Sequence, residues 1–456
     1  MISYISTRGA APALTFAEVL LTGLAPDGGL YVPSTWPAEH TADPNLPYAE
    51  YAAEIMWPFV EGSMERADFD AIAAEAYASF SHPDVIPTSK LADGITIVEL
   101  FHGPTLAFKD VAMQLLGRLF DYELGRQGRR VTIVGATSGD TGSAAIEAFR
   151  DRSNVDIVIL HPHGRTSEVQ RRQMTTVDAS NVFNVAVEGT FDDCQDIVKA
   201  MFADVEFRER VNLAAVNSIN WARVMAQVVY YHWAAAQADD RPVSVTVPTG
   251  NFGNVFAGRV AKRMGASIGE FVVASNRNAI LTEFFTTGAM TINAVEPSLS
   301  PSMDIQVSSN LERRIFELLD GDGAAVAALM ERFRTDGKVS LPADAIPRMQ
   351  EGWIGESLSD PETSEVISAV YEESGIILDP HTAVGVGAAR RRPDLMPRLV
   401  MATAHPAKFP DAVEKATGVR PELPGHLSDL FERTEHFEVL PNDLATIQAF
   451  VEASRS

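Results

Sequence analysis

Short apolar runs alternate with helix-like stretches along most of the chain beyond residue 95. β-Branched runs of about five residues that lead into a polar turn and then a helix are typical of parallel strands with helices on both faces of the sheet. This pattern predicts an α/β protein. The predicted strands are Ile95–Leu100, Arg129–Val134, Val155–Leu160, Val182–Val187, Val243–Val247 and Arg398–Ala402.

Helical periodicity follows several of these strands, at Ser143–Phe149, at Phe191–Phe202 and in a stretch that ends near Met264. Residues 276–370 are less regular and more helical. Ligands of open parallel sheets collect at the carboxyl ends of the strands. The polar residues just after each strand are therefore the candidate site residues.

The first 95 residues show a different pattern, with helix-like stretches arranged around one turn. The stretches are Thr15–Thr22, Tyr48–Trp57 and Asp68–Phe80, and one proline and two glycines supply the turn between Ala25 and Pro33. A proline-rich segment at 82–88 indicates a boundary. We expect a smaller N-terminal domain at residues 1–95, a large domain formed by residues 96–125 and 225–456, and a smaller domain at residues 126–224.

The composition narrows the choice of partners. The 456 residues are 46% hydrophobic and 21% charged, which suits a folded globular protein, and the formal net charge is −24. An acidic surface repels nucleic acid, so an anionic substrate would require locally positive potential in its site. The chain has one cysteine, no predicted signal peptide and no run of about 18 apolar residues. We expect a cytoplasmic protein with neither nucleic-acid nor membrane partners.

Two glycine-rich loops, Val134–Gly142 and Pro248–Asn254, connect predicted strands to predicted helices. Free N–H groups at a helix start and the positive end of the helix dipole bind anions. The first loop lacks the G-x-G-x-x-G spacing of dinucleotide sites, and the second lacks the Gly-Lys-Ser/Thr ending of a Walker loop. A carboxylate or phosphate site therefore fits both loops, with a plain tight turn as the alternative.

Lys109 lies at the start of a predicted helix that covers Asp110–Glu123. The positive end of the helix dipole and the apolar neighbours Phe101 and Phe108 disfavour the charged form of its amine. An amine with a depressed pKa can condense with the aldehyde of a cofactor. By itself, the segment is also explained by a surface lysine that Asp110 compensates.

Thr403 follows the last predicted strand, where its hydroxyl would reach the crevice at the strand ends. A threonine in this position is also typical of a turn or a helix cap. The histidines do not show the His-Glu-x-x-His spacing of a zinc site, and the Gly-x-Ser-x-Gly elbow of a hydrolase is missing from the sequence. We predict no metal site.

Taken together, these segments resemble the threonine synthase family of pyridoxal-phosphate (PLP) enzymes, which have the tryptophan-synthase-β fold. His102-Gly-Pro-Thr-Leu-Ala-Phe-Lys-Asp110 resembles the cofactor-lysine motif of that family. The other matching segments are Ser138–Gly142 (substrate loop), Gly250–Asn254 (phosphate loop), Thr403–Phe409 (pyridine-nitrogen segment), Tyr4–Gly9 and Asp27–Pro33 (N-terminal domain), Pro301–Asn310 and Leu378–Gly385. The resemblance spans nearly the whole chain.

The resemblance implies PLP fold type II, with two parallel-sheet lobes that carry helices on both faces, plus a smaller N-terminal domain. It implies that Lys109 holds PLP covalently and moves protons between substrate carbons. Thr403 would hydrogen-bond the pyridine nitrogen. Residues 96–125 and 225–456 would form the large PLP-binding domain, and residues 126–224 the smaller substrate-loop domain. The cofactor phosphate would be bound by Gly250, Asn251, Phe252, Gly253 and Asn254, and the loop that holds the substrate carboxylate would contain Ser138, Asp140 and Thr141.

The implied reaction converts O-phospho-L-homoserine and water to L-threonine and phosphate, by γ-elimination of phosphate and β-addition of water. The departing phosphate needs a cationic site, for which Arg8, Arg165 and Lys408 are candidates.

A phospho-lyase that forms 2-ketobutyrate, or a threonine dehydratase of the same fold, shares much of this chemistry. Outside the enzymes, the alternative is a non-catalytic protein that binds PLP or an amino acid. The intact Lys109 and the intact loop at 250–254 favour an enzyme. The sequence leaves a monomer and a homodimer open.

Overall fold

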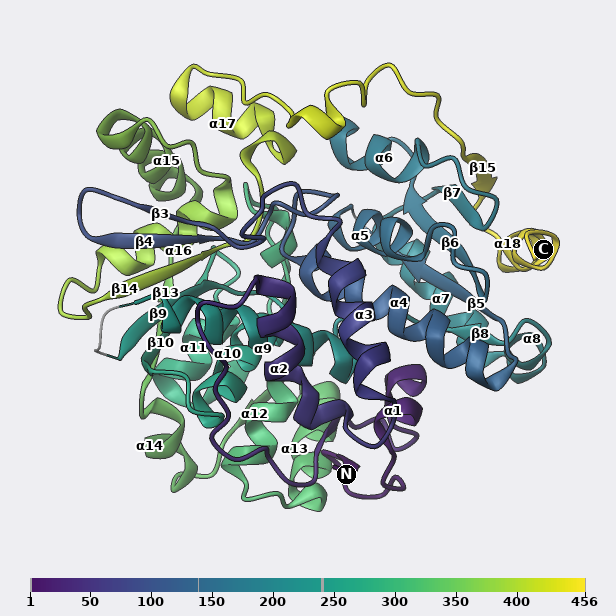
Figure 1. Cartoon of the computed structure of the whole chain (residues 1–456), viewed down its shortest axis with the longest axis horizontal. Helices are drawn as coiled ribbons and strands as arrows, with labels where there is room; N and C mark the ends of the chain where they lie inside the picture. Colours follow the sequence, from purple (N-terminus) through teal and green to yellow (C-terminus); the bar gives the residue numbers. More distant parts are fainter. Residues whose placement is uncertain (1, 138, 239–241, 456) are drawn as a thin grey trace.

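Two sheets form the framework of the molecule (Figure 1). The computed structural model describes residues 2–137, 139–238 and 242–455. In the first sheet all strands are parallel except β3, which pairs antiparallel with β4, and its order is β13 (Trp353–Ser357), β10 (Ile268–Ser275), β9 (Val243–Pro248), β14 (Arg398–Ala402), β4 (Ile95–Glu99), β3 (Thr88–Lys90). The second sheet is parallel, with the order β15 (Glu438–Pro441), β7 (Val182–Glu188), β6 (Val155–Pro162), β5 (Val131–Ala136), β8 (Leu213–Ala214).

Helices cover both faces of the first sheet. Phe271 and Val273 of β10 pack in one core with helices α9 (Trp221–Ala236) and α10 (Gly253–Arg263), whereas Val272 packs with Val384 of α16 (Pro380–Arg390). Successive residues of a strand point to opposite faces, so these cores lie on opposite sides of the sheet. Other helices around this sheet are α11 (Ile280–Thr287), α12 (Leu311–Leu318), α13 (Gly323–Asp336), α14 (Ala345–Gln350), α15 (Asp360–Ser374), α17 (Pro410–Thr417) and the 3₁₀ turns at Pro301–Met303 and Pro406–Lys408. β11 (Ala289–Thr291) and β12 (Lys338–Ser340) form a separate antiparallel pair.

The N-terminal segment packs on the start of α9. β1 (Tyr4–Ser6) pairs with β2 (Tyr31–Pro33), and α1 (Phe16–Thr22), α2 (Tyr48–Val60) and α3 (Arg66–Tyr77) follow along the chain. The buried indole of Trp221 contacts the rings of Tyr4 and Phe59, with centroids 5.9 and 5.6 Å away. This contact fixes the first turn of α9.

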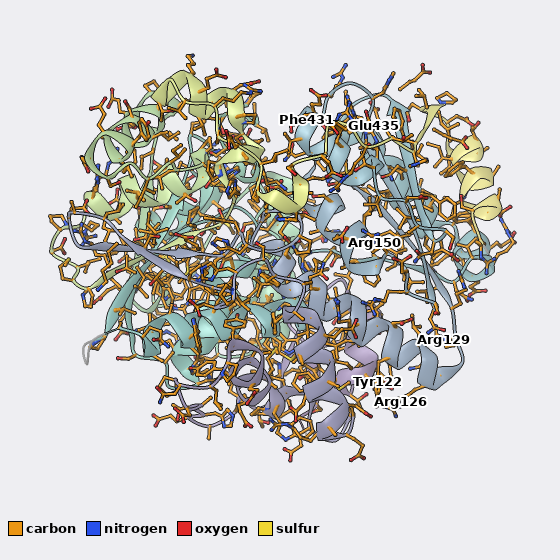
Figure 2. All side chains as sticks on the ribbon, turned by 45° about the horizontal axis from the view of Figure 1, so that its top comes forward. Tyr122, Arg126, Arg129, Arg150, Phe431 and Glu435 are labelled. Carbon is orange, nitrogen blue, oxygen red and sulfur yellow. The ribbon has the colours of Figure 1, made fainter. Side chains whose placement is uncertain are left out.

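The second sheet carries the remaining helices, α5 (Asp140–Phe149), α6 (Glu168–Thr175), α7 (Phe191–Ala203), α8 (Val205–Arg210) and α18 (Leu444–Ala453). The long helix α4 (Lys109–Gln127) packs against both α5 and α9 and so joins the two lobes. After α17, the chain crosses to the second lobe through a 3₁₀ turn at Gly425–Leu427 and ends there in β15 and α18. Phe431 and Glu435 of this crossing lie against α6 (Figure 2).

The prediction of an α/β fold with parallel sheets is confirmed, and each of the six predicted strands is present with ends that differ by at most two residues. The pattern missed β10, β13 and β15 and the helix α9. Glycine and glutamate interrupt the apolar run of β10, and the apolar start of β13 gives way to glycine, glutamate and serine. Among the described residues, no helix is both long and apolar enough to cross a membrane.

The domain division remains a prediction, but two pairings differ from it. β3 belongs to the first sheet although it lies before residue 96, because it pairs with β4. β15 pairs with β7 of the second sheet, although residues 225–456 were assigned to the large domain. The sequence of the last segment does not reveal this return, since its strand has only 4 residues, begins with a glutamate and ends with a proline.

Candidate active site

The loop before Lys109 is held in shape by Asp110. The Asp110 carboxylate accepts hydrogen bonds from the Thr105 N–H (2.8 Å) and the Thr105 hydroxyl (2.7 Å). Gly103 lies directly against it, since a Cβ at that position would stand 2.4 Å from the Asp110 Cβ. Asp110 is therefore occupied with the loop, and the alternative of a surface lysine that Asp110 compensates is wrong.

Lys109 begins α4, as predicted, and its side chain is only 12% exposed. Its Nζ lies 3.3 Å from Asp140 Oδ2 at the start of α5. Burial lowers the pKa of the Lys109 amine; Asp140 opposes this shift, whereas the nearby cations of Lys408 and Arg223 add to it. The amine is thus placed to lose its proton more readily than an ordinary lysine.

The loop 250–254 joins β9 to α10 and has an unusual backbone. Phe252 caps α10 in the left-handed region at φ 62°, and its ring packs against the rings of Phe285 and Trp353 in the core. This packing holds a conformation that costs about 1–3 kcal/mol for a residue with a side chain. A Cβ on Gly250 would lie 2.8 Å from the Ser302 carbonyl oxygen. The loop therefore presents backbone N–H groups at a helix start to the adjoining cavity.

Asn254, the last residue of this loop, supplies a buried donor. Its Oδ1 accepts hydrogen bonds from the hydroxyls of Tyr230 (2.6 Å) and Tyr231 (2.7 Å). This fixes the orientation of the amide and leaves Nδ2 buried, without an acceptor among the described residues. Buried donors are normally paired, so a missing acceptor points to a ligand.

Thr403 lies directly after β14 and beside the Lys109 loop. The Phe108 N–H donates to the Thr403 carbonyl oxygen (2.9 Å), and Ala107 bridges to Ala404. Thr403 is 6% exposed and lines the same cavity as Lys109. The two segments that the sequence singled out separately therefore meet at one point.

The loop at 138–142 lies on the facing lobe. Ser138 is outside the described residues. Gly139 has φ 150°, and a Cβ there would meet the Gln170 side chain at 2.5 Å. Thr141 lines the cavity, whereas the Asp140 carboxylate contacts Lys109, Lys408 and Gln170. Although burial opposes ionisation, the two lysines hold the pKa of Asp140 well below its usual range.

One cavity between the lobes collects these residues. It adds side chains to which the sequence analysis gave no role: Ser218, Arg223, Gln227, Ser302, Met303 and His381. Arg223 is 4% exposed, and its Nε and Nη1 have no hydrogen-bond partner within the described part of the chain. Burial lowers its pKa to about 10. The signal available in the sequence was a single arginine in the largely apolar stretch that forms α9.

His381 holds one wall of the cavity in place. Its Nε2 accepts the Ser302 N–H (3.2 Å), so its Nδ1 donates to Asp379 (2.9 Å) and the ring is neutral. The Ser302 hydroxyl in turn donates to Asp140 Oδ2 at 3.1 Å. His381 therefore acts on the site through Ser302.

Family comparisons agree with this arrangement. A model described as "Threonine synthase N terminus" matches residues 3–77, one described as "Threonine synthase, C-terminal" matches residues 382–451, and one described as "Pyridoxal-phosphate dependent enzyme" matches residues 90–405. Threonine synthase of Pseudomonas aeruginosa is 54% identical over 98% of this chain and 97% of its own length. The chain belongs to the threonine synthase family.

Solved structures of the family have the same fold. PLP-bound threonine synthase from Brucella melitensis superposes with a TM-score of 0.96 at 48% identity, over 100% of this chain and 99% of that one. Threonine synthase from yeast gives 0.93 at 38% identity, over 99% and 98%. A threonine deaminase from Solanum lycopersicum gives 0.51 at 13% identity, over 85% and 98%, and shows the fold alone. The predictions of PLP fold type II, of a PLP-dependent lyase and of PLP as cofactor are confirmed.

The cavity of this family member fits PLP. The aldehyde of PLP requires an amine, its phosphate requires a set of hydrogen-bond donors, and its pyridine nitrogen requires a hydrogen-bonding group. The cavity offers the Lys109 amine, the unpaired Asn254 Nδ2 beside the amides of 250–254, and the Thr403 hydroxyl. Gly250 leaves the space that a Cβ would fill.

The three cations predicted for the departing phosphate are not free at the cavity. Arg8 forms a paired contact with Glu312, with Nε–Oε1 and Nη2–Oε2 distances of 3.1 and 2.8 Å. Lys408 is fully buried and donates to Thr105, Gln173 and Asp140. Arg165 is exposed on the second lobe and does not line the cavity. Arg223, which the sequence analysis missed, lines the cavity with a guanidinium whose Nε and Nη1 have no partner among the described residues.

Proposed function

We propose that this chain converts O-phospho-L-homoserine and water to L-threonine and phosphate with PLP as cofactor. The observation that carries the proposal is the cavity in which an amine of lowered pKa, a helix-start loop and an unpaired buried arginine converge. A substrate that is itself a phosphate ester, processed with a phosphate-bearing cofactor, calls for two anion sites. Because the protein has a net charge of −24, the positive potential at these anion sites must come from local donors and cations.

We propose that Lys109 holds PLP covalently. The amides and Asn254 side chain of loop 250–254 bind the cofactor phosphate, and the Thr403 hydroxyl hydrogen-bonds the pyridine nitrogen. When bound, PLP supplies an electron sink that stabilises negative charge on the substrate carbons. A neutral hydroxyl at the ring nitrogen leaves the ring less protonated than a carboxylate would.

The substrate carboxylate is assigned to the start of α5, around Ser138, Asp140 and Thr141. N–H groups at that helix start suit an anion, and Thr141 lines the cavity. The Asp140 carboxylate faces Lys109, so Asp140 contributes its backbone to this loop and its side chain to the lysine.

The substrate phosphate is assigned to Arg223 and Ser218. Both line the cavity beside Asn251, and the Arg223 guanidinium has free donors there. A charged hydrogen bond to a departing phosphate stabilises the negative charge that grows as its bond to Cγ breaks. The Lys109 amine is positioned to remove and return protons, and water adds at Cβ.

The experiment that tests this function identifies the products. Purified protein is incubated with PLP and O-phospho-L-homoserine, and phosphate, threonine and 2-ketobutyrate are assayed together. Equal amounts of phosphate and threonine are expected. Phosphate with 2-ketobutyrate would instead assign a phospho-lyase, and the absence of phosphate would reject this substrate.

A Lys109→Ala variant tests the role of the lysine. We expect loss of turnover and loss of PLP that is trapped covalently by borohydride, because no amine remains within reach of the aldehyde. Lys415→Ala, at an exposed position of α17, is the control and keeps both. Threonine formation by Lys109→Ala at a rate near that of the wild type would refute the assignment.

A further inference from the structure

Lys408 is a fully buried lysine whose ammonium group lies between the two lobes. Its Nζ contacts the Thr105 carbonyl oxygen at 2.6 Å, Gln173 Oε1 at 2.9 Å and Asp140 Oδ1 at 3.1 Å. An ammonium has three hydrogens, so each has an acceptor. Lys408 does not line the cavity, and the geometry gives it no direct contact with a ligand.

Asp140 is shared between two lysines. Its Oδ2 lies 3.3 Å from Lys109 Nζ and 3.1 Å from the Ser302 hydroxyl, while its Oδ1 contacts Lys408 and Gln170. The side chains of Asp140 and Lys408 are 5% and 0% exposed. One buried carboxylate therefore faces two ammonium groups. Because two like charges at short range repel each other, the charged form of one of the two lysines is disfavoured.

The other ionisable groups around this cluster do not remove the excess charge. Arg223 adds a further cation. His381 is neutral, because its Nε2 accepts the Ser302 N–H. Asp110 is held by Thr105, and burial raises its pKa only to about 6, so it is a carboxylate at neutral pH. With Asp140 it makes two anions against the three cations Lys109, Lys408 and Arg223. Within the described residues, the cluster is positive and favours the loss of one proton.

Lys109 is the lysine of this cluster that loses a proton. If Lys408 gave up its charge, its two remaining N–H groups could serve only two of its three acceptors. Lys109, by contrast, has one contact to Asp140 and otherwise faces the cavity. Attachment of an amine to an aldehyde requires the unprotonated form. Its lone pair forms the new C–N bond, and the carbonyl oxygen leaves as water.

We propose that Lys408 is a positioning residue that takes Asp140 as its own counter-ion and so frees the Lys109 amine for the cofactor aldehyde. This inference rests on the proposed role of Lys109 as the PLP lysine. Lys408 also keeps Asp140 ionised and aimed at Lys109 when the amine is neutral. It acts through Asp140 and does not touch the reacting atoms.

The test measures how fast the cofactor-free protein attaches PLP as a function of pH. Attachment is followed by the visible absorbance, and borohydride reduction with peptide mapping verifies the site. In Lys408→Met, Lys109 holds its proton more tightly, so the pH midpoint of attachment rises by about one unit and the rate at neutral pH falls about tenfold. Lys408→Arg keeps the charge and restores a midpoint near that of the wild type.

Two further variants separate this role from a structural one. Lys415→Met removes the same charge from an exposed position of α17 and leaves the midpoint unchanged. Gln173→Glu keeps Lys408 but gives it a second carboxylate 2.9 Å away, so Asp140 is returned to Lys109 and the midpoint rises. This variant decides the question even if Lys408→Met does not fold.

The outcomes are distinct. Unchanged midpoints in Lys408→Met and Gln173→Glu overturn the role of Lys408 and leave the proposed function intact. A wild-type protein that attaches no PLP at Lys109 overturns both the PLP lysine and this inference.

Discussion

At the residue scale, two buried arginines near the start of α9 illustrate opposite uses of the same side chain. Arg313 donates to the carbonyl oxygens of Tyr31 (2.9 Å from Nη2) and Ile219 (2.6 Å), and to Asn310. Arg313 thereby joins β2 to the segment just before α9. Arg223 is as deeply buried but has free donors at the cavity. We infer that Arg313 has a structural role, whereas Arg223 is available to bind an anion.

We therefore expect opposite stability effects. Arg223→Met removes an unpaired buried charge and should stabilise the cofactor-free protein by about 1–3 kcal/mol, while kcat/KM for O-phospho-L-homoserine falls at least about 100-fold. Arg313→Met leaves buried carbonyl oxygens without donors and should cost about 2–4 kcal/mol. Urea unfolding and steady-state kinetics measure both. A destabilised Arg223→Met with normal kinetics would contradict the anion role.

The sequence revealed the residues that stand in recognisable motifs and missed those defined only by packing. Lys109, Thr403 and loop 250–254 follow strands or begin helices, so their positions in the chain indicated the strand-end crevice. Ser302 and His381 come from irregular segments that only the fold brings together. Only the alternative of a surface lysine gave Lys109 a partner, its chain neighbour Asp110. In the structure the partner is Asp140 of the facing lobe, because the start of α5 lies at the start of α4.

At the scale of elements, the approach of α4 to α5 sets the distance between Lys109 and Asp140. The two helices touch through Gly117 of α4. A Cβ there would lie 2.2 Å from the Ala148 carbonyl oxygen of α5. Only glycine allows this separation. The starts of both helices then bring the amine and the carboxylate within 3.3 Å of each other.

Two glycines of α4 make a matched pair of variants. Gly117→Ala should force the helices apart, cost at least about 2 kcal/mol and slow PLP attachment, because Asp140 moves away from Lys109. Gly125→Ala, where the nearest atom to a Cβ is Asn154 Nδ2 at 3.5 Å, should stabilise the same helix by about 0.5–1 kcal/mol. Thermal unfolding compares them. Equal effects of the two substitutions would exclude close packing as the reason for Gly117.

The sequence predicted the elements whose local pattern is strong. Runs rich in β-branched residues, such as Val155–Pro162 with two valines and two isoleucines, form strands. α9 is apolar on nearly all sides because it is buried between α2, α4 and α10, so it lacks the amphipathic period of a surface helix. β15 has exposed and polar positions, and only its pairing with β7 makes it a strand.

At the scale of the whole molecule, the segment after α17 ties the lobes together above the site. Glu435 accepts hydrogen bonds from Arg171 (2.8 and 2.9 Å) and from the Thr175 hydroxyl (2.7 Å) of α6. The Arg172 guanidinium lies 5.7 Å from the Phe431 ring. α6 also carries Gln170 and Gln173, which contact Asp140 and Lys408. The crossing therefore supports the cluster that faces Lys109.

The contribution of Glu435 should depend on pH. Burial opposes its ionisation, but the hydrogen bonds from Arg171 and Thr175 hold the pKa of its carboxyl below the ordinary value of 4.5. A carboxyl whose pKa is lowered by folding adds stability above its unfolded pKa and loses it as the pH falls through the folded value. Glu435→Gln should therefore cost about 1–2 kcal/mol at pH ~7, and the difference from wild type should shrink in acid.

Urea unfolding of both proteins at neutral and acidic pH measures this difference. Glu438→Gln, three residues further on at an exposed position of β15, is the control and should match the wild type at each pH. Because α6 loosens without its anchor, Glu435→Gln should also raise KM for O-phospho-L-homoserine more than it lowers kcat. A loss of stability that stays constant down to acidic pH would show that the Glu435 charge is not what holds the crossing to α6.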